Sequence, residues 1–136
     1  MSTYYYLPTR NVFGAGSVSE VGALMGSLGG KRTMIVTDSF LATHPMTTQI
    51  QDILKQSGIE SAVFGGAEPN PKDTNVEAGL AFYQEHDCDS MISLGGGSSH
   101  DCAKAIAVGA PAEGDFWEKF YVNWESAETG IPLGVI

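Results

Sequence analysis

Short apolar runs alternate along the chain with segments whose apolar residues recur every three or four positions. Uninterrupted apolar runs are typical of buried strands, and a spacing near 3.6 residues is typical of helices that bury one face. The runs predict strands at 33–37, 59–64, 91–94 and 131–136. The spaced segments predict helices at 17–28, 47–56, 74–85 and 99–108, and a short helix at 115–121. This alternation predicts an α/β fold, in which a parallel sheet has helices on both faces.

Three of the predicted helices have recognisable start signals. Ser17 with Glu20, and Thr74 with Glu77, have the spacing of a capping box, in which two side chains satisfy free backbone N–H groups at a helix start. Pro45 is expected to start or precede the helix at 47–56, because proline suits the first helical turn.

Residues 1–13 are rich in aromatic and β-branched residues. The segments 4–7 and 11–13, on either side of Pro8, predict two short strands that form a β-ribbon ahead of the sheet. A base-stacking role for the three tyrosines at 4–6 is the less favoured interpretation. Strand packing, or pairing of this ribbon with a second subunit, is favoured, and the latter predicts a homo-oligomer.

A buried strand, a glycine turn and a helix follow one another around Gly95, Gly96 and Gly97. The first N–H groups of a helix point outward with the positive end of the helix dipole, so this order predicts an anion site. Ser98 is expected to cap the helix or bind phosphate, and Asp101 has a spacing that can close the helix start. The turn matches neither G-x-G-x-x-G nor the P-loop pattern, and a purely structural glycine turn is the alternative.

Two further polar residues follow predicted strands. Asp38 comes directly after the strand at 33–37, and Asn70 lies between Pro69 and Pro71 in the next strand-to-helix loop. Asn70 suits either a fixed hydrogen bond to a ligand or an ordinary turn. Because the carboxyl ends of parallel strands meet at one edge, we expect both residues to converge there with the glycine turn.

Composition limits the kinds of partner. The 136 residues suit one domain, and the formal net charge of −9 argues against nucleic acid or an anionic membrane. Any phosphate is therefore expected to be held by local dipoles. No leader pattern or membrane-spanning stretch is found, which predicts a cytoplasmic protein.

The sequence offers no set of metal ligands. His44, His86 and His100 do not share the i, i+4 spacing of a zinc motif. We predict that His100, in the first turn after the glycines, faces solvent and is not catalytic. Cys88 and Cys102 lack C-x-x-C spacing and are expected to be buried and reduced. The chain itself is thus predicted to contain neither a metal site nor catalytic residues.

Three segments carry a family resemblance: IVTD at 35–38, EPNPKDTNV at 68–76 and GGGSSHDCAKAIA at 95–107. In this order and at these separations they resemble the N-terminal domain of the iron-containing (group III) alcohol dehydrogenases, particularly the 1,3-propanediol, butanol and methanol dehydrogenase branch. The segments NVFGAGS (11–17), near the start of the chain, and IPLGVI (131–136), at its end, agree with it. The resemblance implies a Rossmann-like, dehydroquinate synthase-like domain that binds NAD(P), in an enzyme that interconverts primary alcohols or diols and aldehydes.

The resemblance also implies roles for individual residues. Gly97 and Ser98 would contact the cofactor pyrophosphate, Asn70 would lie beside the adenosine half, and Asp38 would accept hydrogen bonds from the ribose hydroxyls. Gly95, Gly96 and Asp101 complete the predicted cofactor site. A carboxylate at position 38 favours a ribose 2′-hydroxyl over a 2′-phosphate, so NAD is expected to bind more tightly than NADP.

In the resembled enzymes Fe²⁺ lies in a second, helical domain. Residues 1–136 are expected to be a single dinucleotide-binding domain without that metal-binding domain, a truncated form that does not catalyse the reaction alone. The alternatives are a zinc enzyme fragment of the glycerol dehydrogenase or dehydroquinate synthase type, and a non-catalytic nucleotide-binding or oligomerisation module. A third alternative is a site for another phosphorylated ligand, indifferent to Asp38.

Overall fold

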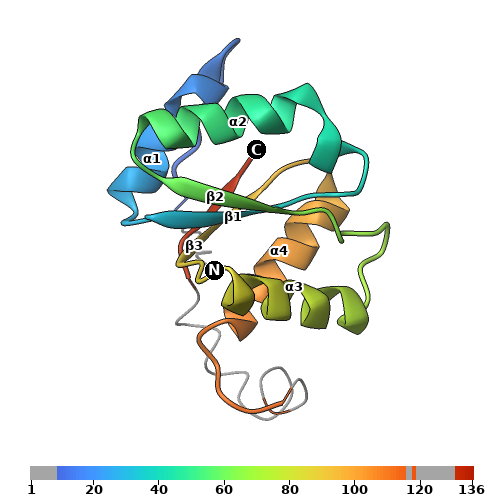
Figure 1. Ribbon diagram of the computed structural model, residues 1–136. Helices are drawn as coiled ribbons and strands as arrows, with labels where there is room; N and C mark the ends of the chain where they lie inside the picture. Colours follow the sequence, from blue (N-terminus) through green and yellow to red (C-terminus); the bar gives the residue numbers. More distant parts are fainter. Residues whose placement is uncertain (1–8, 116–117, 119–130) are drawn as a thin grey trace, which may run out of the picture.

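The computed structural model describes residues 9–115, 118 and 131–136, and within these ranges a parallel sheet lies between two layers of helices (Figure 1). The strands are β1 (Arg32–Val36), β2 (Glu60–Phe64), β3 (Ser90–Ser93) and β4 (Leu133–Val135). The helices are η1 (Ser17–Glu20), α1 (Val21–Ser27), η2 (Leu41–Thr43), α2 (Pro45–Gln56), α3 (Asp73–Glu85) and α4 (Gly97–Gly109). None of them has both the length and the apolar composition needed to cross a bilayer. The predicted α/β class is confirmed.

The strand order is β2-β1-β3-β4, and every neighbouring pair is parallel. The chain adds β2 on one side of β1 and then returns through α3 to place β3 on the other side. The direction of winding therefore reverses between β1 and β3. At such a switch point the loops after the two central strands part, and ligands bind in the crevice outside the carboxyl ends.

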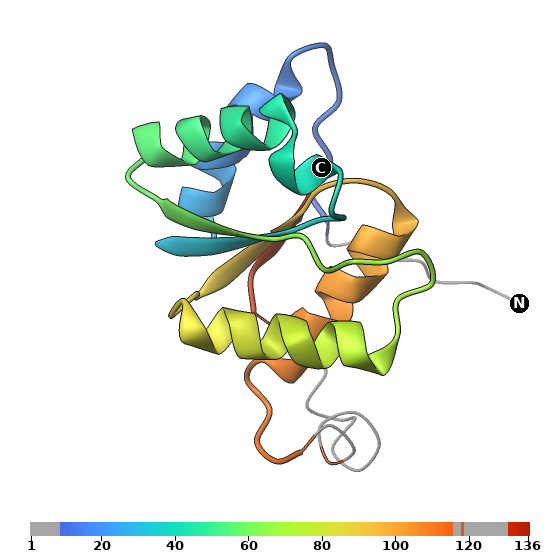
Figure 2. The same cartoon turned by 45° about the vertical axis from the view of Figure 1, so that its right-hand side comes forward.

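Alternate side chains of the central strands enter two separate cores, because successive residues of a strand point to opposite faces. Met34 and Met91 pack with residues of α3 and α4, whereas Ile35 and Ile92 pack with residues of α1 and α2. All four are 0% exposed. Figures 1 and 2 show α1 and α2 on one face of the sheet and α3 and α4 on the other. Burial on both faces explains why the strands are continuous apolar runs.

Neither predicted capping box forms. Ser17 begins the 3₁₀ helix η1, which follows Gly16 at φ 81° and has no side-chain cap. The helix α3 begins at Asp73, so Thr74 lies inside its first turn and Lys72 occupies the cap position. The predictions were wrong for two reasons. The helix α3 starts two residues earlier than a Thr74 cap requires, and Ser17 begins a 3₁₀ turn whose cap position is occupied by Gly16.

The described part of the predicted N-terminal ribbon is not a strand. Residues 11–13 have no β-structure, and the Phe13 side chain is 91% exposed. The prediction for this segment was wrong because these three residues have no pairing partner in the described ranges. They therefore lack the inter-strand hydrogen bonds that stabilise a strand. The predicted strand at 4–7 and all of the predicted helix at 115–121 except Asp115 and Glu118 lie outside the described residues.

Asp89 ties the start of β3 to the start of β1. Its Oδ1 accepts hydrogen bonds from the backbone N–H groups of Lys31 and Arg32, at 3.0 and 3.1 Å, and from the Ser90 hydroxyl at 2.9 Å. Partial desolvation opposes ionisation, but these hydrogen bonds outweigh it and hold the pKa of Asp89 below its ordinary value of 3.8. The ionised form therefore stabilises the fold.

Asp89→Asn is expected to lower the free energy of unfolding by about 1 kcal/mol at pH 7, because the amide is a weaker acceptor for three donors. Since the folded-state pKa is depressed, this stabilisation is present above about pH 5 and is lost as the pH falls through 4 and then through the folded value. Urea unfolding at pH 7 and pH 3 should show the difference shrinking at the lower pH. Asp87→Asn is the control, because the Asp87 side chain is 86% exposed and its carboxylate lies as far as 3.9 Å from the Arg32 guanidinium. An equal loss in both variants would contradict the assignment.

Candidate functional site

Loops that follow β1, β2 and β3 pack together at the carboxyl edge of the sheet, on the right in Figure 1. A Cβ added to Gly65, just after β2, would lie 2.8 Å from the Cβ of Ala42 in η2. A Cβ added to Gly95, just after β3, would lie 3.3 Å from Cδ1 of Leu41 in the same short helix. The loops after β2 and β3 therefore both rest against the turn that follows β1, and the predicted convergence is confirmed.

Thr37 joins these loops by hydrogen bonds. Its hydroxyl donates to the carbonyl of Leu94 at 2.8 Å, next to the glycine turn. Its carbonyl accepts from the N–H of Ala67 at 3.1 Å, in the loop after β2, and its own N–H donates to the carbonyl of Phe64 at 2.9 Å. Thr37 is 0% exposed. One buried residue thus fixes the positions of the loops after β2 and β3 relative to β1.

At the glycine turn, the first backbone N–H groups of α4 are unpaired within the described residues. Gly96 is the N-cap of α4, and no side chain caps the helix. The N–H groups of Gly97, Ser98 and Ser99 have no hydrogen-bond partner among residues 9–115, 118 and 131–136. A Cβ added to Gly96 or Gly97 would have no atom within 4 Å. Unpaired amides at the positive end of a helix, with free space in front of them, are suited to bind an anion such as a phosphate group.

Ser98 and Asp101 do not close the helix start as expected. Because α4 begins at Gly97, Ser98 lies within the first turn, and its Oγ accepts a long hydrogen bond of 3.4 Å from the N–H of Asn70. Asp101 is exposed and pairs with Lys104 at 3.4 Å, one turn further along the helix. The expected capping by these side chains is wrong, because the helix starts earlier than the sequence pattern indicated. Their role in cofactor binding stays a prediction.

Asp38 lies half-buried at the end of β1, with one carboxylate oxygen already bonded. Its Oδ1 accepts from the N–H groups of Phe40 at 2.9 Å and Leu41 at 2.8 Å, which caps η2. The other oxygen, Oδ2, has no hydrogen-bond partner in the part of the chain that the structure describes. Asp38 can therefore accept a hydrogen bond from a ligand without losing its contacts within the protein.

Asn70 sits at the exposed tip of the loop after β2, with a positive φ of 53° that asparagine tolerates better than most residues. A second asparagine, which the sequence reasoning missed, holds this loop. The side chain of Asn75 accepts from the N–H of Lys72 at 2.8 Å and donates to the carbonyl of Gly66 at 3.1 Å. Its position three residues after the cap was the available signal, since that is where a capping-box acceptor belongs.

His100 does not face solvent as predicted. It is half-buried, and its Nδ1 lies 2.5 Å from the hydroxyl of Ser93, which is the last residue of β3 and is 0% exposed. The bond connects the residues that precede and follow the glycine turn. Ser93 was also missed, because a serine at the end of an apolar run carries no signal for a partner seven residues away.

Within the described ranges, no three His, Cys, Asp or Glu side chains are grouped so that they could hold a metal ion. Cys88 and Cys102 are buried and free, as predicted. Burial raises the pKa of Cys88 to about 11 and also raises the pKa of Cys102, so both thiols stay protonated at neutral pH and are poor ligands or nucleophiles. Iron does not fit the described residues, whereas a dinucleotide phosphate fits the open glycine turn.

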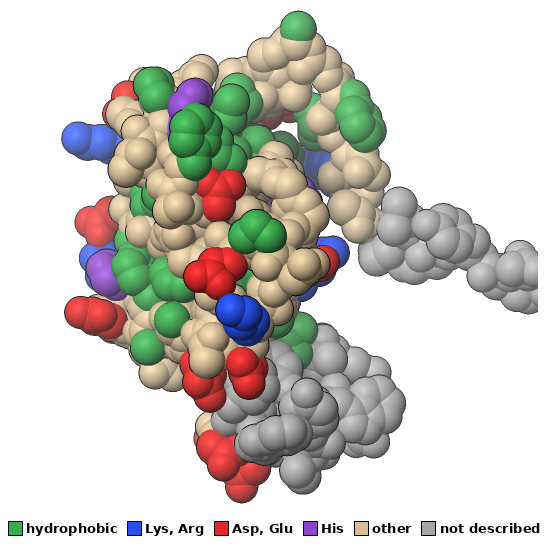
Figure 3. Space-filling model, turned by 90° about the vertical axis from the view of Figure 1, so that its right-hand side faces the viewer, with side chains coloured by type: hydrophobic (Ala, Val, Ile, Leu, Met, Phe, Trp, Pro, Cys, Tyr) green, Lys and Arg blue, Asp and Glu red, His purple; other side chains and the backbone are tan. Residues whose placement is uncertain are grey.

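A cavity of about 250 Å³ lies at the opposite edge of the sheet, where the strands begin. Its lining includes Arg32, but also the carboxylates of Glu60, Glu85 and Asp87. The guanidinium of Arg32 is already paired with Glu60. An excess of negative charge makes this cavity unsuitable for phosphate, so the carboxyl edge shown in Figure 3 remains the candidate site.

A model of the family described as iron-containing alcohol dehydrogenase matches residues 8–136. This chain belongs to the iron-containing alcohol dehydrogenase family. The assignment confirms the resemblance of the three motifs. The members compared below are each named as dehydrogenases.

Individual family members show how much of each enzyme the chain represents. The chain is 41% identical over 130 residues to 1,3-propanediol dehydrogenase from Klebsiella pneumoniae, covering 94% of this chain and 33% of that protein. It is 39% identical over 106 residues to NAD-dependent methanol dehydrogenase from Bacillus methanolicus, covering 78% and 28%. The crystal structure of NADH-dependent butanol dehydrogenase A from Thermotoga maritima superposes with a TM-score of 0.87 at 28% identity, covering 98% and 34%. The chain thus spans about a third of the length of these relatives.

Proposed function

We propose that residues 1–136 form the NAD-binding domain of an alcohol dehydrogenase that interconverts primary alcohols or diols and aldehydes. The observation that carries this proposal is the open turn at Gly96 and Gly97, where three helix N-terminal amides have no partner in the described ranges. Two of the relatives are named as NAD- or NADH-dependent, which supports the choice of dinucleotide.

The arrangement supports one placement of the cofactor. The pyrophosphate would lie on the amides of Gly97 and Ser98, and the free Oδ2 of Asp38 would accept from a hydroxyl of the adenosine ribose. Asn70 would contact the adenosine half, because its loop touches α4 through Ser98. The bound dinucleotide supplies hydride transfer at its nicotinamide ring, and this chain's residues bind and orient it.

Iron and the alcohol are proposed to bind outside the described residues, because no metal-ligand group occurs within them. The 136-residue chain alone is therefore proposed to bind NAD without catalysing the reaction. Assembly as a homo-oligomer through the N-terminal residues remains part of the proposal. So does a cytoplasmic location, which two free, buried thiols support.

Titration with the two cofactors tests the proposal directly. NAD⁺ is expected to bind the chain about ten- to a hundredfold more tightly than NADP⁺, because Asp38 accepts from a 2′-hydroxyl and repels a 2′-phosphate. Asp38→Asn should reduce the ratio of the NADP⁺ to the NAD⁺ dissociation constant, because the negative charge is lost while an asparagine Oδ1 can still cap η2. Calorimetry gives both dissociation constants.

The matched control is Asp52→Asn, which removes an exposed carboxylate on α2. This variant should leave the ratio of the two dissociation constants unchanged. Equal affinity of the unmodified chain for both cofactors would remove Asp38 from this role. No heat with NAD⁺ and no binding of ADP-ribose would instead favour a non-catalytic interaction module.

A further inference from the structure

Phe40 is a large apolar side chain placed in the open beside the candidate site. It follows Asp38 by two residues and is 73% exposed. Single exposed apolar residues are ordinary, and Leu28 at 51% is one of them. Phe40 differs because residues on both sides of it in the sequence contribute to the candidate site. Asp38 lies two residues before it, and Leu41, the next residue, lies against Gly95 of the glycine turn.

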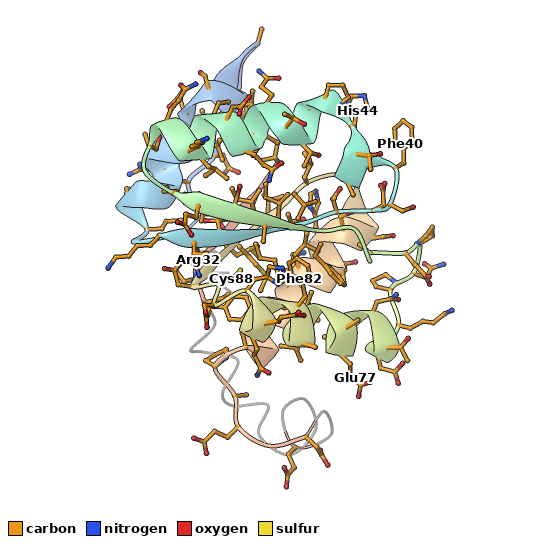
Figure 4. All side chains as sticks on the ribbon, viewed as in Figure 1. Arg32, Phe40, His44, Glu77, Phe82 and Cys88 are labelled. Atoms are coloured by element: carbon orange, nitrogen blue, oxygen red, sulfur yellow. The ribbon has the colours of Figure 1, made fainter. Side chains whose placement is uncertain are left out.

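The Phe40 backbone and ring are both held in place. Its N–H donates to Asp38 Oδ1 at 2.9 Å, and its ring lies 5.7 Å from the ring of His44 at an angle of 39°. His44 is fixed in turn, because its Nδ1 accepts from the N–H of Met46 at 3.2 Å at the start of α2. Figure 4 shows Phe40 and His44 projecting from this turn on the side where the strands end. A fixed ring that remains largely exposed is suited to stack on a flat ligand.

We propose that Phe40 stacks on the adenine ring of the dinucleotide. The inference rests on the proposed function, because it takes the adenosine ribose to be bound by Asp38. Two residues of chain span at most roughly 7 Å, and adenine is attached directly to that ribose, so the ring of Phe40 is within reach of the base. Aromatic side chains stack on bases with substantial affinity because every base has a π-face. Phe40 would thus form an adenine subsite beside the proposed phosphate and ribose subsites.

Two substitutions separate stacking from general apolar contact. Phe40→Leu keeps an apolar side chain and the backbone cap of η2 but has no aromatic face, and it is expected to weaken NAD⁺ and ADP-ribose binding about tenfold. Phe40→Trp keeps an aromatic face and should bind both within about twofold of the unmodified chain. Leu28→Ala, at the opposite edge of the sheet, should change neither affinity. Calorimetry on the 136-residue chain measures all four proteins.

A nuclear Overhauser measurement identifies the stacked group. With ¹³C-labelled phenylalanine, ring protons of the protein should show contacts to H2 or H8 of adenine in bound NAD⁺, and these contacts should be absent in Phe40→Leu. Unchanged NAD⁺ affinity in Phe40→Leu would overturn the inference, and so would Overhauser contacts to adenine that persist in this variant. Burial of the Phe40 ring under another segment of protein would also overturn it. Failure of the unmodified chain to bind NAD⁺ at all would instead reject the proposed function, so the two failures are distinguishable.

Discussion

Gly97→Asp is expected to raise the dissociation constant for NAD⁺ by at least about a hundredfold while the fold stays at least as stable. The substitution places a carboxylate where the pyrophosphate is proposed to lie, in the space above the first turn of α4. The fold should accept it, because Gly97 does not have a positive φ and no atom lies within 4 Å of the added Cβ. An acidic side chain at a helix N-terminus contributes about 0.3–1 kcal/mol of stability. Calorimetry and urea unfolding measure the two quantities.

The control for added charge is Gln84→Glu, which introduces one carboxylate at the exposed end of α3, on the opposite edge. It should leave NAD⁺ binding unchanged, because it lies at the end of α3 that leads to the start of β3, and salt screens interactions between distant exposed charges. If Gly97→Asp bound NAD⁺ as well as the unmodified chain, the phosphate would have to lie away from this helix start.

Thr37→Val should lower both stability and cofactor affinity. The two side chains have nearly the same shape, but valine leaves the buried carbonyl of Leu94 without its 2.8 Å hydrogen bond. An unsatisfied buried acceptor costs about 1–3 kcal/mol of unfolding free energy. Because that bond fixes the glycine turn to the end of β1, NAD⁺ affinity should also fall about tenfold. Urea unfolding and calorimetry on the same samples measure both effects.

Thr33→Val is the matched control, since Thr33 is equally buried on β1 but lies four residues earlier, at the other edge of the sheet. Its hydroxyl bonds to Ser90 at 2.8 Å, and Ser90 keeps a second partner in Asp89. The variant should lose some stability and keep its NAD⁺ affinity. Equal losses of affinity in both variants would mean that Thr37 acts only through overall stability.

The central strands were predictable because they are buried on both faces. The run from Thr33 to Thr37 matches β1 to within one residue, and the run from Met91 to Leu94 matches β3 equally well. Burial of this kind leaves a continuous apolar signal that depends little on distant contacts. The convergence of Asp38 with the glycine turn followed from parallel topology alone, which requires only the alternation of strands and helices.

Details that depend on exact helix starts or on distant partners were not predictable. Ser17 and Thr74 had the right spacing for caps, yet backbone geometry placed other residues at the cap positions. The contact of Ser93 with His100 arises only after the glycine turn has brought two elements together. Residues 11–13 had β-forming composition, but propensity does not form a strand without a neighbour to pair with.

The two amide hydrogen bonds to Asp38 Oδ1 have a thermodynamic consequence for ligand binding. A flexible acidic side chain loses conformational entropy when it is immobilised by a ligand, at a cost on the order of 0.5–1.5 kcal/mol. The folded chain has already restricted the Asp38 carboxylate before any nucleotide arrives. A sugar hydroxyl that bonds to the remaining oxygen would therefore meet a preorganised acceptor, and the contact would lose less conformational entropy on binding.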